Sequence, residues 1–155
     1  MCAAITSSLK ALDLQLDIKE FQRSVIEQYS QGNDCFCVAG TGAGKSLIYI
    51  LCPFIMDILA GIDIADNASL HSIVLIVQPL KALMRDQKDK LLKLGLAATY
   101  VGEDDLLELN RGVHNYIIAS PETATSTSFL KSIETIKCRM SAFLLMRAIV
   151  YKRCK

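Results

Sequence analysis

The sequence predicts an α/β domain built on a parallel sheet, and two observations lead to this fold class. Short apolar, partly β-branched runs alternate along the chain with longer segments of helical spacing or helix-forming composition. Such alternation is typical of parallel strands joined by right-handed crossovers. The 155 residues are enough for about one domain, and no internal repeat, low-complexity tract or clear linker divides them. We therefore expect one domain over residues 1–155.

The expected elements follow from the lengths and composition of these segments. Buried strands are expected at the apolar runs Cys35–Ala39, Ile73–Val77, Ala97–Val101, Tyr116–Ala119 and Ala142–Tyr151. Helices are expected over Ser46–Ala60, Leu80–Leu94, Glu103–Leu109 and a stretch after Pro121. The connection Gly61–His71 is long enough to be a surface loop.

Composition and charge exclude several classes of protein. A hydrophobic fraction of 52% supplies a core and excludes intrinsic disorder. The formal net charge of +1 excludes a strongly basic nucleic-acid coat and an acidic disordered tail. The longest apolar stretch, Leu47–Met56, is interrupted by Pro53 and is too short for a membrane span. No secretory or transit pattern opens the sequence, so we expect an intracellular protein without a membrane partner.

The cysteines and histidines do not predict a metal centre. The six cysteines lack CxxC spacing and a signal peptide, which favours free thiols. Cys35 and Cys37 lie two apart in an apolar run, so a strand would turn both to one buried face, where core filling is favoured over metal ligation. His71 and His114 each precede an apolar run without a partner at ligand spacing, and we expect them in surface loops.

The strongest motif is AGTGAGKS, residues 39–46, which has the spacing of a phosphate-binding loop. An apolar strand precedes it and an apolar helix follows, a context that disfavours a chance glycine-rich turn. Backbone amides near the glycines can surround phosphates, and the helix N-terminus adds partial positive charge. Lys45 is expected to reach the β and γ phosphates, and Ser46 to be a magnesium ligand. The expected nucleotide-binding residues in the loop are Gly40, Thr41, Gly42, Ala43, Gly44, Lys45 and Ser46.

Upstream, Gln22 ends the segment IKEFQ and precedes the loop lysine by 23 residues. Its side-chain amide can pair with the amine and a ring nitrogen of adenine. Taken alone, a glutamine near a helix start is more often solvated surface.

Downstream, the run Ile73–Val77 leads into QPLKALMRDQ, residues 78–87. Apolar residues recur there at helical spacing and are expected to face the core: Leu80, Leu83, Met84, Leu91 and Leu94. A basic stripe lies on another face of the same helix: Lys81, Arg85 and Lys88. Beside a nucleotide site, this stripe suits a phosphate backbone, although a solvated amphipathic helix is the commoner case.

Taken together, these segments resemble the RecQ-like DNA helicases. QPLKALMRDQ is similar to motif Ia of that family, IKEFQ to its adenine-reading motif zero, TGAGKS to motif I and IASPE, residues 118–122, to motif Ib. The resemblance implies a three-layer P-loop NTPase domain of the RecA-like type, the first of two such domains in the parent protein. Such a domain binds ATP with magnesium and one DNA strand, and hydrolysis drives 3'-5' translocation. A eukaryotic member would be nuclear.

The resemblance also assigns residues. It implies that residues 1–33 form a lead-in helix and that Gln22 reads adenine from it. It implies contacts with single-stranded or unwinding DNA at Pro79, Leu80, Lys81, Arg85 and Ser120.

The chain departs from the family pattern after motif Ib. The family continues with a strand that ends in Asp-Glu-x-His, whose acids hold magnesium and position the attacking water. That tetrad is absent, and the corresponding run reads FLLMRA, residues 143–148. Motif III, the second RecA-like domain and its arginine finger are also missing. We therefore expect a RecA-like domain truncated before or within the Walker B strand. A non-catalytic nucleotide-binding or nucleic-acid-binding remnant and a different small P-loop NTPase remain as alternatives.

The genetic code offers a reason for the missing tetrad. Met146 must be encoded by ATG. If Leu145 ends in G, Arg147 is AGG and Ala148 is GCC, a frame shifted back by one nucleotide reads GAT-GAG-GGC-CAT into the Ile149 codon. This frame encodes Asp-Glu-Gly-His. The hypothesis is an out-of-frame motif II, against the alternative of coincidental codon choices.

Overall fold

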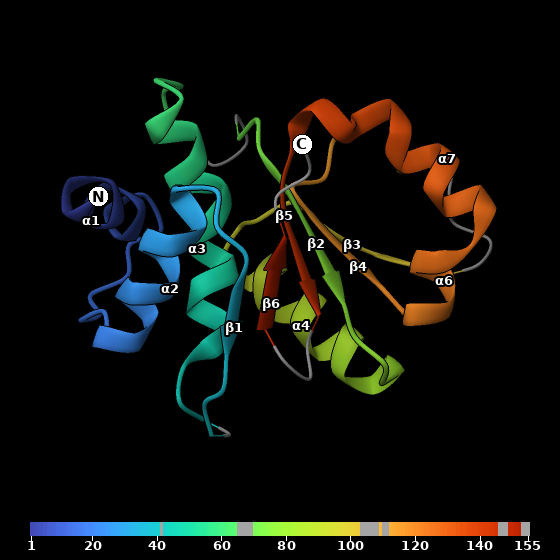
Figure 1. Ribbon diagram of the computed structural model, residues 1–155, viewed down its shortest axis with the longest axis horizontal. Coiled ribbons are helices and arrows are strands. Elements are labelled where there is room, and N and C mark those ends of the chain that lie inside the picture. The colour runs from blue at the N-terminus through green and yellow to red at the C-terminus, as the bar shows by residue number, and fades with distance from the viewer. Residues whose placement is uncertain (41, 65–69, 103–108, 110–111, 146–148, 153–155) are drawn as a thin grey trace.

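The computed structural model describes residues 1–40, 42–64, 70–102, 109, 112–145 and 149–152, and side chains as far as Ala142 (Figure 1). Within these residues one six-stranded sheet has the order β1-β6-β5-β2-β4-β3. The strands are β1 Cys35–Cys37, β2 Ile73–Val77, β3 Ala98–Val101, β4 Tyr116–Ala119, β5 Met140–Leu145 and β6 Ile149–Lys152. The helices are α1 Cys2–Ala11, α2 Glu20–Ser30, α3 Lys45–Leu59, α4 Lys81–Lys93, α6 Pro121–Thr125 and α7 Thr127–Ile136, with a 3-10 turn over Lys137–Arg139.

The predicted α/β class is confirmed, and most of the sheet is parallel. Strand β2 pairs in parallel with both β4 and β5, and β3 pairs in parallel with β4. Strand β6 pairs antiparallel with both β1 and β5. Because β6 is antiparallel to each, β1 and β5 run in the same direction, and the carboxyl ends of β1, β5, β2, β4 and β3 meet at one edge.

The prediction of one strand over Ala142–Tyr151 is wrong. The run contains most of β5 and then β6, which returns beside β5, with Leu144 opposite Tyr151. Inner strands of a sheet are covered on both faces and are apolar throughout. An apolar run of this length therefore does not distinguish one long strand from two paired ones.

The prediction of a lead-in helix over residues 1–33 is also wrong, since two helices occupy this segment. Helix α1 ends at Ala11, and Asp13 takes a φ of 51°, outside the helical region. Helix α2 begins only at Glu20. The helix expected over Glu103–Leu109 falls almost entirely outside the described residues.

The sheet is the middle of three layers, as predicted. Side chains alternate along each strand, so β2 sends Val74 and Ile76 to one face and Ile73, Leu75 and Val77 to the other. The first face packs against α2, α3 and α4 through a core that includes Ile48, Phe54, Met84 and Leu91, and α1 packs on α3. The second face is covered by α7 through Phe129 and Ile136, and Figure 1 shows this helix on the far side of the sheet from α3.

Strand β1 is shorter than predicted and lies at the end of the sheet. It ends at Cys37 rather than Ala39. Cys35 and Cys37 are half-buried and pack against the core, as the alternation predicts, while Phe36 between them is 69% exposed. Strand β1 is therefore covered on one face only.

A buried carboxylate ties α3 to the amino edge of the sheet. Asp57 is fully buried in α3, and its carboxylate accepts hydrogen bonds from the backbone amides of His71 at 2.6 Å and Ser72 at 3.0 Å. The Asn115 amide donates to the Leu70 carbonyl at 2.8 Å, and the Arg139 guanidinium donates to the His71 and Gly112 carbonyls at 2.7 and 2.6 Å. This polar cluster fixes the chain that enters β2.

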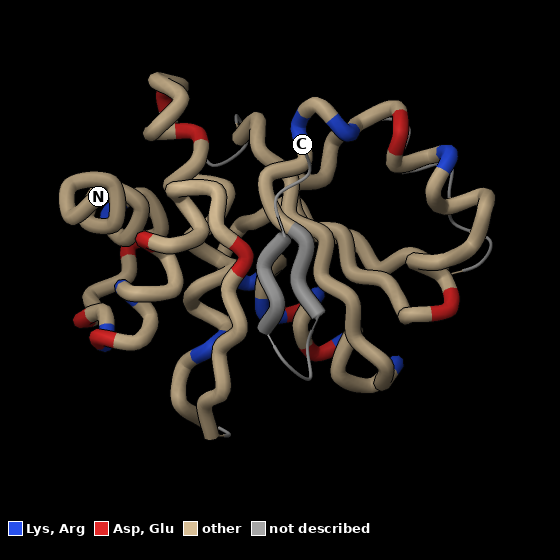
Figure 2. Tube along the Cα trace, viewed as in Figure 1, with Lys and Arg blue, Asp and Glu red and all other residues tan. Residues whose placement is uncertain are grey.

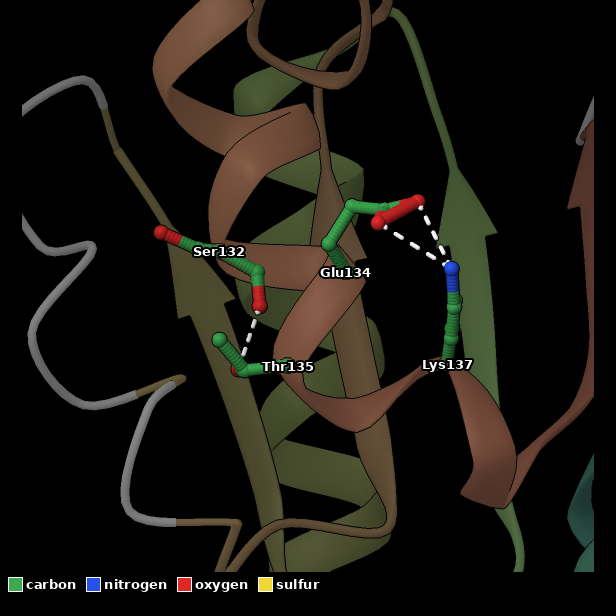
Figure 3. A network of polar contacts seen from close by, with 4 residues as sticks. All are labelled: Ser132, Glu134, Thr135 and Lys137. Carbon is green, nitrogen blue, oxygen red and sulfur yellow. Dashed lines mark hydrogen bonds and ion pairs between the residues drawn. The ribbon is translucent and has the colours of Figure 1, made fainter.

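Residues of both charges are mixed along the chain, and Figure 2 shows the positions of lysine and arginine scattered among those of aspartate and glutamate. At the end of α7, Lys137 pairs with Glu134 at 3.1 Å, and the Thr135 hydroxyl donates to the Ser132 carbonyl at 2.7 Å (Figure 3). Exposed pairs of this kind stabilise a fold little. Among the described helices, none is long and apolar enough to span a membrane.

Candidate functional site

Three predicted segments meet at the carboxyl edge of the sheet. The glycine-rich loop follows β1, the segment from Gln78 to Lys81 follows β2, and Ser120 follows β4. The register pairs Val77 with Ala119, so Pro79 and Ser120 leave neighbouring strands at the same edge. The loop and the start of α4 both lie toward the bottom of the view in Figure 1. In open parallel sheets this edge is where ligands bind.

The loop has the backbone that a phosphate cradle requires. Gly42 and Gly44 have φ angles of 76° and 93°, a region that glycine adopts without strain. A Cβ atom added at Gly40 or Gly42 would meet nothing within 4 Å, so both residues face open space. Gly44 is the N-cap of α3, and Ala43 donates its amide to the Gly40 carbonyl at 3.2 Å. Thr41 lies outside the described residues.

The Lys45 side chain folds back onto the phosphate-binding loop. Its Nζ donates to the carbonyls of Ala39 at 2.6 Å and Gly40 at 2.7 Å. Hydrogen bonds from an ammonium to a charged phosphate oxygen are stronger than those to a neutral carbonyl. The lysine is therefore held at the loop and can exchange these carbonyls for phosphate.

Gln22 is brought to the same loop from α2. Its Nε2 donates to the Gly44 carbonyl at 2.7 Å, and its Oε1 accepts from the Lys19 backbone amide at 2.9 Å. The side chain is 2% exposed, so the interpretation as solvated surface is wrong. Both ends of the amide are occupied by protein groups.

Lys19 is a loop contact that the sequence analysis missed. Its Nζ donates to the Ala43 carbonyl at 3.0 Å, which adds a second ammonium group to the loop. The available signal was a lysine three residues before Gln22, at the start of a helix. From this position the ammonium group of Lys19 reaches the same loop as the Gln22 side chain.

The start of α4 is exposed. Pro79, Lys81 and Arg85 are exposed, and so are Leu80 and Leu83, at 53% and 43%. The prediction that Leu80 and Leu83 face the core is wrong, because these residues precede or lie in the first turn of α4, beyond the end of β2. Met84 and Leu91, further along the helix, are fully buried as predicted, and Leu94 is half-buried.

Ser120 is a helix cap. Its hydroxyl accepts from the Thr123 amide at 3.1 Å and starts α6, and the residue is 9% exposed. A hydrogen bond from the Ser120 side chain and another from the backbone of Glu122 itself lower the pKa of the Glu122 carboxyl. The charge of Lys81 lowers this pKa further. This edge therefore carries a carboxylate beside the predicted phosphate-binding lysine, which the sequence analysis did not consider.

Two buried tyrosines join α3 to the elements packed beside it. The Tyr49 hydroxyl of α3 donates to Oε1 of Gln87 on α4, and the Tyr116 hydroxyl of β4 donates to the Ile50 carbonyl at 2.6 Å. Burial raises the pKa of Tyr49 to about 12, although a hydrogen bond with the Ser46 side chain acts in the opposite direction. Burial also raises the pKa of Tyr116 well above its usual value. Neither tyrosine was singled out from the sequence.

A large hollow of about 1840 Å³ lies at the opposite edge of the sheet. It lies between the C-terminal ends of α2 and α3 and helix α7, and its lining includes Asp34, Asp57, Leu130 and Lys137. Among the described residues predicted for nucleotide or DNA binding, none lines it. The site argued from the sequence is therefore the loop at the carboxyl edge.

The residues of the loop fit a nucleoside triphosphate with magnesium. The open space at Gly40 and Gly42 is the space that a side chain would fill, and it lies beside Lys45. Ser46 offers a hydroxyl oxygen, and magnesium in nucleotide sites is held by few protein oxygens together with phosphates and waters. Fold and loop together define the class as an α/β domain of the phosphate-loop type.

Comparison with known proteins gives the family. Residues 19–142 match the DEAD/DEAH box helicase family, and the chain belongs to that family as a helicase ATP-binding domain. It is 29% identical over 139 residues to the ATP-dependent DNA helicase RecQ of Haemophilus influenzae, covering 84% of this chain and 20% of that protein. It is 31% identical over 111 residues to the ATP-dependent DNA helicase Q-like SIM of Arabidopsis thaliana, covering 68% of this chain and 11% of that protein.

A third relative is the ATP-dependent DNA helicase hus2/rqh1 of Schizosaccharomyces pombe, 27% identical over 114 residues, with 72% of this chain and 8% of that protein covered. The resemblance to RecQ-like helicases is confirmed. The chain spans a fifth or less of the length of these relatives. Membership of the family implies the use of ATP, typically with magnesium, and interaction with nucleic acid.

Proposed function

We propose that this chain is the ATP-binding part of a RecQ-like DNA helicase that couples ATP hydrolysis to 3'-5' translocation and DNA unwinding. The observation that carries the proposal is the contact between Gln22 and the loop, with 2.7 Å between Nε2 and the Gly44 carbonyl. It brings an amide suited to adenine next to a loop suited to phosphates. In the parent protein a second RecA-like domain completes the machinery.

The side chains proposed to bind the nucleotide are hydrogen bonded to loop carbonyls in this structure. Lys45 leaves the Ala39 and Gly40 carbonyls and pairs with the β and γ phosphates. Gln22 exchanges the Gly44 carbonyl for the adenine edge, which selects ATP over GTP because guanine presents a carbonyl where adenine presents an amine. Gly42, Gly44 and the backbone amides around Ala43 surround the phosphates. Ser46 would hold a magnesium ion bound with the nucleotide, and that ion would neutralise phosphate charge.

Hydrolysis by the isolated chain is expected to be negligible. The Asp-Glu-x-His tetrad that positions water in the family does not occur in the 155 residues. Strand β5 ends at Leu145, opposite Val77 at the carboxyl edge, where these acids would follow. The absent tetrad favours a second candidate function, a non-catalytic remnant that binds nucleotide or nucleic acid without turnover.

DNA binding is assigned to the exposed start of α4. The helix N-terminus and the side chains of Lys81 and Arg85 suit a phosphate backbone, and Pro79 and Leu80 present an apolar surface beside them. Ser120 contributes by its position at the same edge, with its hydroxyl retained as the α6 cap. With a net charge of only +1, binding is expected to be weak and independent of DNA sequence.

Calorimetric titration of the chain with ATP and with GTP in magnesium tests the proposal. We expect ATP and ADP to bind, GTP to bind more weakly, and Lys45→Ala to abolish binding. Lys93→Ala, which removes an exposed lysine at the far end of α4, is the matched control and should bind as the parent chain does. DNA-stimulated turnover comparable to that of an intact helicase would contradict the expected lack of hydrolysis. Absence of ATP binding would overturn the proposal as a whole.

A further inference from the structure

A buried glutamine interrupts the apolar face of α4. The buried residues of this helix are Met84, Gln87 and Leu91, spaced three and four apart, so Gln87 lies on the same face as two fully buried apolar side chains. Gln87 itself is 8% exposed. Burying an amide costs free energy unless the amide is hydrogen bonded. A glutamine at this position therefore requires a partner in the core.

That partner is Tyr49 of α3. The Tyr49 hydroxyl is hydrogen bonded to Oε1 of Gln87, and Tyr49 is 1% exposed. An amide oxygen carries no proton, so the tyrosine is the donor. Because burial raises the pKa of Tyr49 to about 12, the hydroxyl keeps this proton at neutral pH. The hydrogen bond joins two helices across 38 residues of sequence.

The two partners lie close in sequence to the two proposed binding surfaces. Tyr49 follows Lys45 by one helical turn, and the Lys45 ammonium is bonded to the phosphate loop. Gln87 follows Lys81 and Arg85 in α4, and these are the exposed cations assigned to DNA. Both helices begin at the carboxyl edge of the sheet. The hydrogen bond therefore joins the helix that starts at the loop to the helix that carries the proposed DNA contacts.

We propose that Tyr49 and Gln87 are positioning residues that couple nucleotide binding to DNA binding. This inference rests on the proposed function, which gives the loop two states: Lys45 binds loop carbonyls in the free state and phosphate in the bound state. A change in the first turn of α3 shifts Tyr49, and in a close-packed interior the hydrogen bond passes that shift to α4. ATP and DNA then change the affinity of the chain for each other by the same factor.

Replacing both partners separates coupling from folding. Tyr49→Phe leaves the Gln87 oxygen without its donor, and Gln87→Met leaves the Tyr49 hydroxyl without its acceptor, so each single variant should be less stable than the parent chain. The double variant puts apolar groups of similar shape in both places, which is close to neutral for stability. A bond that served folding alone would leave the double variant with the binding behaviour of the parent chain.

Tyr116→Phe is the matched control. Tyr116 is a fully buried tyrosine, and its hydroxyl donates to the Ile50 carbonyl at 2.6 Å. That hydrogen bond ties α3 to β4 instead of to α4. The control therefore removes a buried hydroxyl bonded to the same helix and leaves the link between Tyr49 and Gln87 in place.

The test measures the dissociation constant of ATP in excess magnesium, with and without a saturating single-stranded oligonucleotide, and takes the ratio as the coupling factor. We expect a factor of about fivefold or more in the parent chain, and the same factor when the oligonucleotide is titrated with and without ATP. In the double variant we expect a factor of about 1, with ATP still bound and a melting temperature near that of the parent chain. Tyr116→Phe should keep the factor of the parent chain.

The coupling factors decide between a linking role and a merely structural one. A factor of about 1 in the parent chain, or an unchanged factor in the double variant, would overturn the inference and leave the proposed function intact. An equal loss of coupling in Tyr116→Phe would also overturn it. If the double variant does not fold, as judged by thermal melting, the factor in Gln87→Met decides in its place, and an unchanged value overturns the inference. If the parent chain binds no ATP or no oligonucleotide, that part of the proposed function fails and this inference fails with it.

Discussion

The side-chain amide of Gln22 donates to the main-chain carbonyl of Gly44 at 2.7 Å, across 22 residues of sequence. Gly44 has a φ of 93°, and a Cβ atom built on it would lie 2.7 Å from Gln22 Nε2. Glycine is therefore favoured at this N-cap of α3 for two separate reasons: other residues are strained in its backbone conformation, and a side chain there would have to displace the glutamine amide. This contact ties the lead-in segment to the phosphate loop.

Substitution of the loop glycines should separate these two reasons. Gly44→Ala is expected to lower the free energy of unfolding by about 1–3 kcal/mol, because a side chain at this φ is strained and meets Gln22. Gly42→Ala, with a φ of 76° and open space, should show the backbone strain alone, and Gly40→Ala should be close to neutral. Urea unfolding of the three variants checks this order. Equal stability of the Gly44→Ala and Gly40→Ala chains would contradict it.

Binding of single-stranded DNA should depend on the start of α4. The double variant Lys81→Ala with Arg85→Ala should weaken binding equally for all DNA sequences. It should also flatten the dependence of log affinity on log salt by about 0.7 for each phosphate that the variant no longer neutralises. Titration of labelled oligonucleotides at several salt concentrations measures both effects. The control, Lys90→Ala with Lys93→Ala, removes the same charge from the last turn of the same helix. A similar weakening in the control would point to net charge rather than to this surface.

The buried carboxylate of Asp57 should be important for stability. Asp57→Ala leaves the buried amide of Ser72 and the amide of His71 without their acceptor, and is expected to lower the free energy of unfolding by about 1–3 kcal/mol. Denaturant unfolding checks this value. Asp86→Ala removes an exposed carboxylate paired with Lys90 and should change stability by less than about 1 kcal/mol. A larger effect from Asp86 than from Asp57 would contradict the expectation.

The frame hypothesis for the missing tetrad is tested by nucleotide sequence. We expect codons 145–149 to permit Asp-Glu-Gly-His in the frame shifted back by one nucleotide, and that frame to remain open beyond this point toward motif III. Sequencing the transcript together with the genomic DNA distinguishes a sequencing error, an intron boundary and a true frame break. Codons incompatible with the tetrad, or a shifted frame that closes at once, would reject the hypothesis. Residues 146–148 lie outside the described part of the structure.

Much of the fold and the centre of the site were predictable from the sequence because their signals are local. The loop is defined by eight consecutive residues, AGTGAGKS, and the flanking strand and helix by their own apolar spacing. Strands β2 and β4 were predicted with their correct bounds, since each is a short apolar run buried on both faces. Family membership followed from four short motifs in order.

Other features depended on which distant segments pack together, and only the tertiary structure decided them. Asp57 ends an apolar stretch of the sequence, and two amides fourteen and fifteen residues later surround its carboxylate. Leu80 is exposed because β2 ends before it and no strand in the described part of the chain lies beneath the start of α4. Residues 140–152 form two strands because the second, β6, pairs with β1 as well as with β5. The burial of Gln22 and the pairing of Tyr49 with Gln87 likewise require α2, α3 and α4 to lie side by side. Sequence spacing reports the periodicity of one element, whereas burial and hydrogen bonding are set by its neighbours in space.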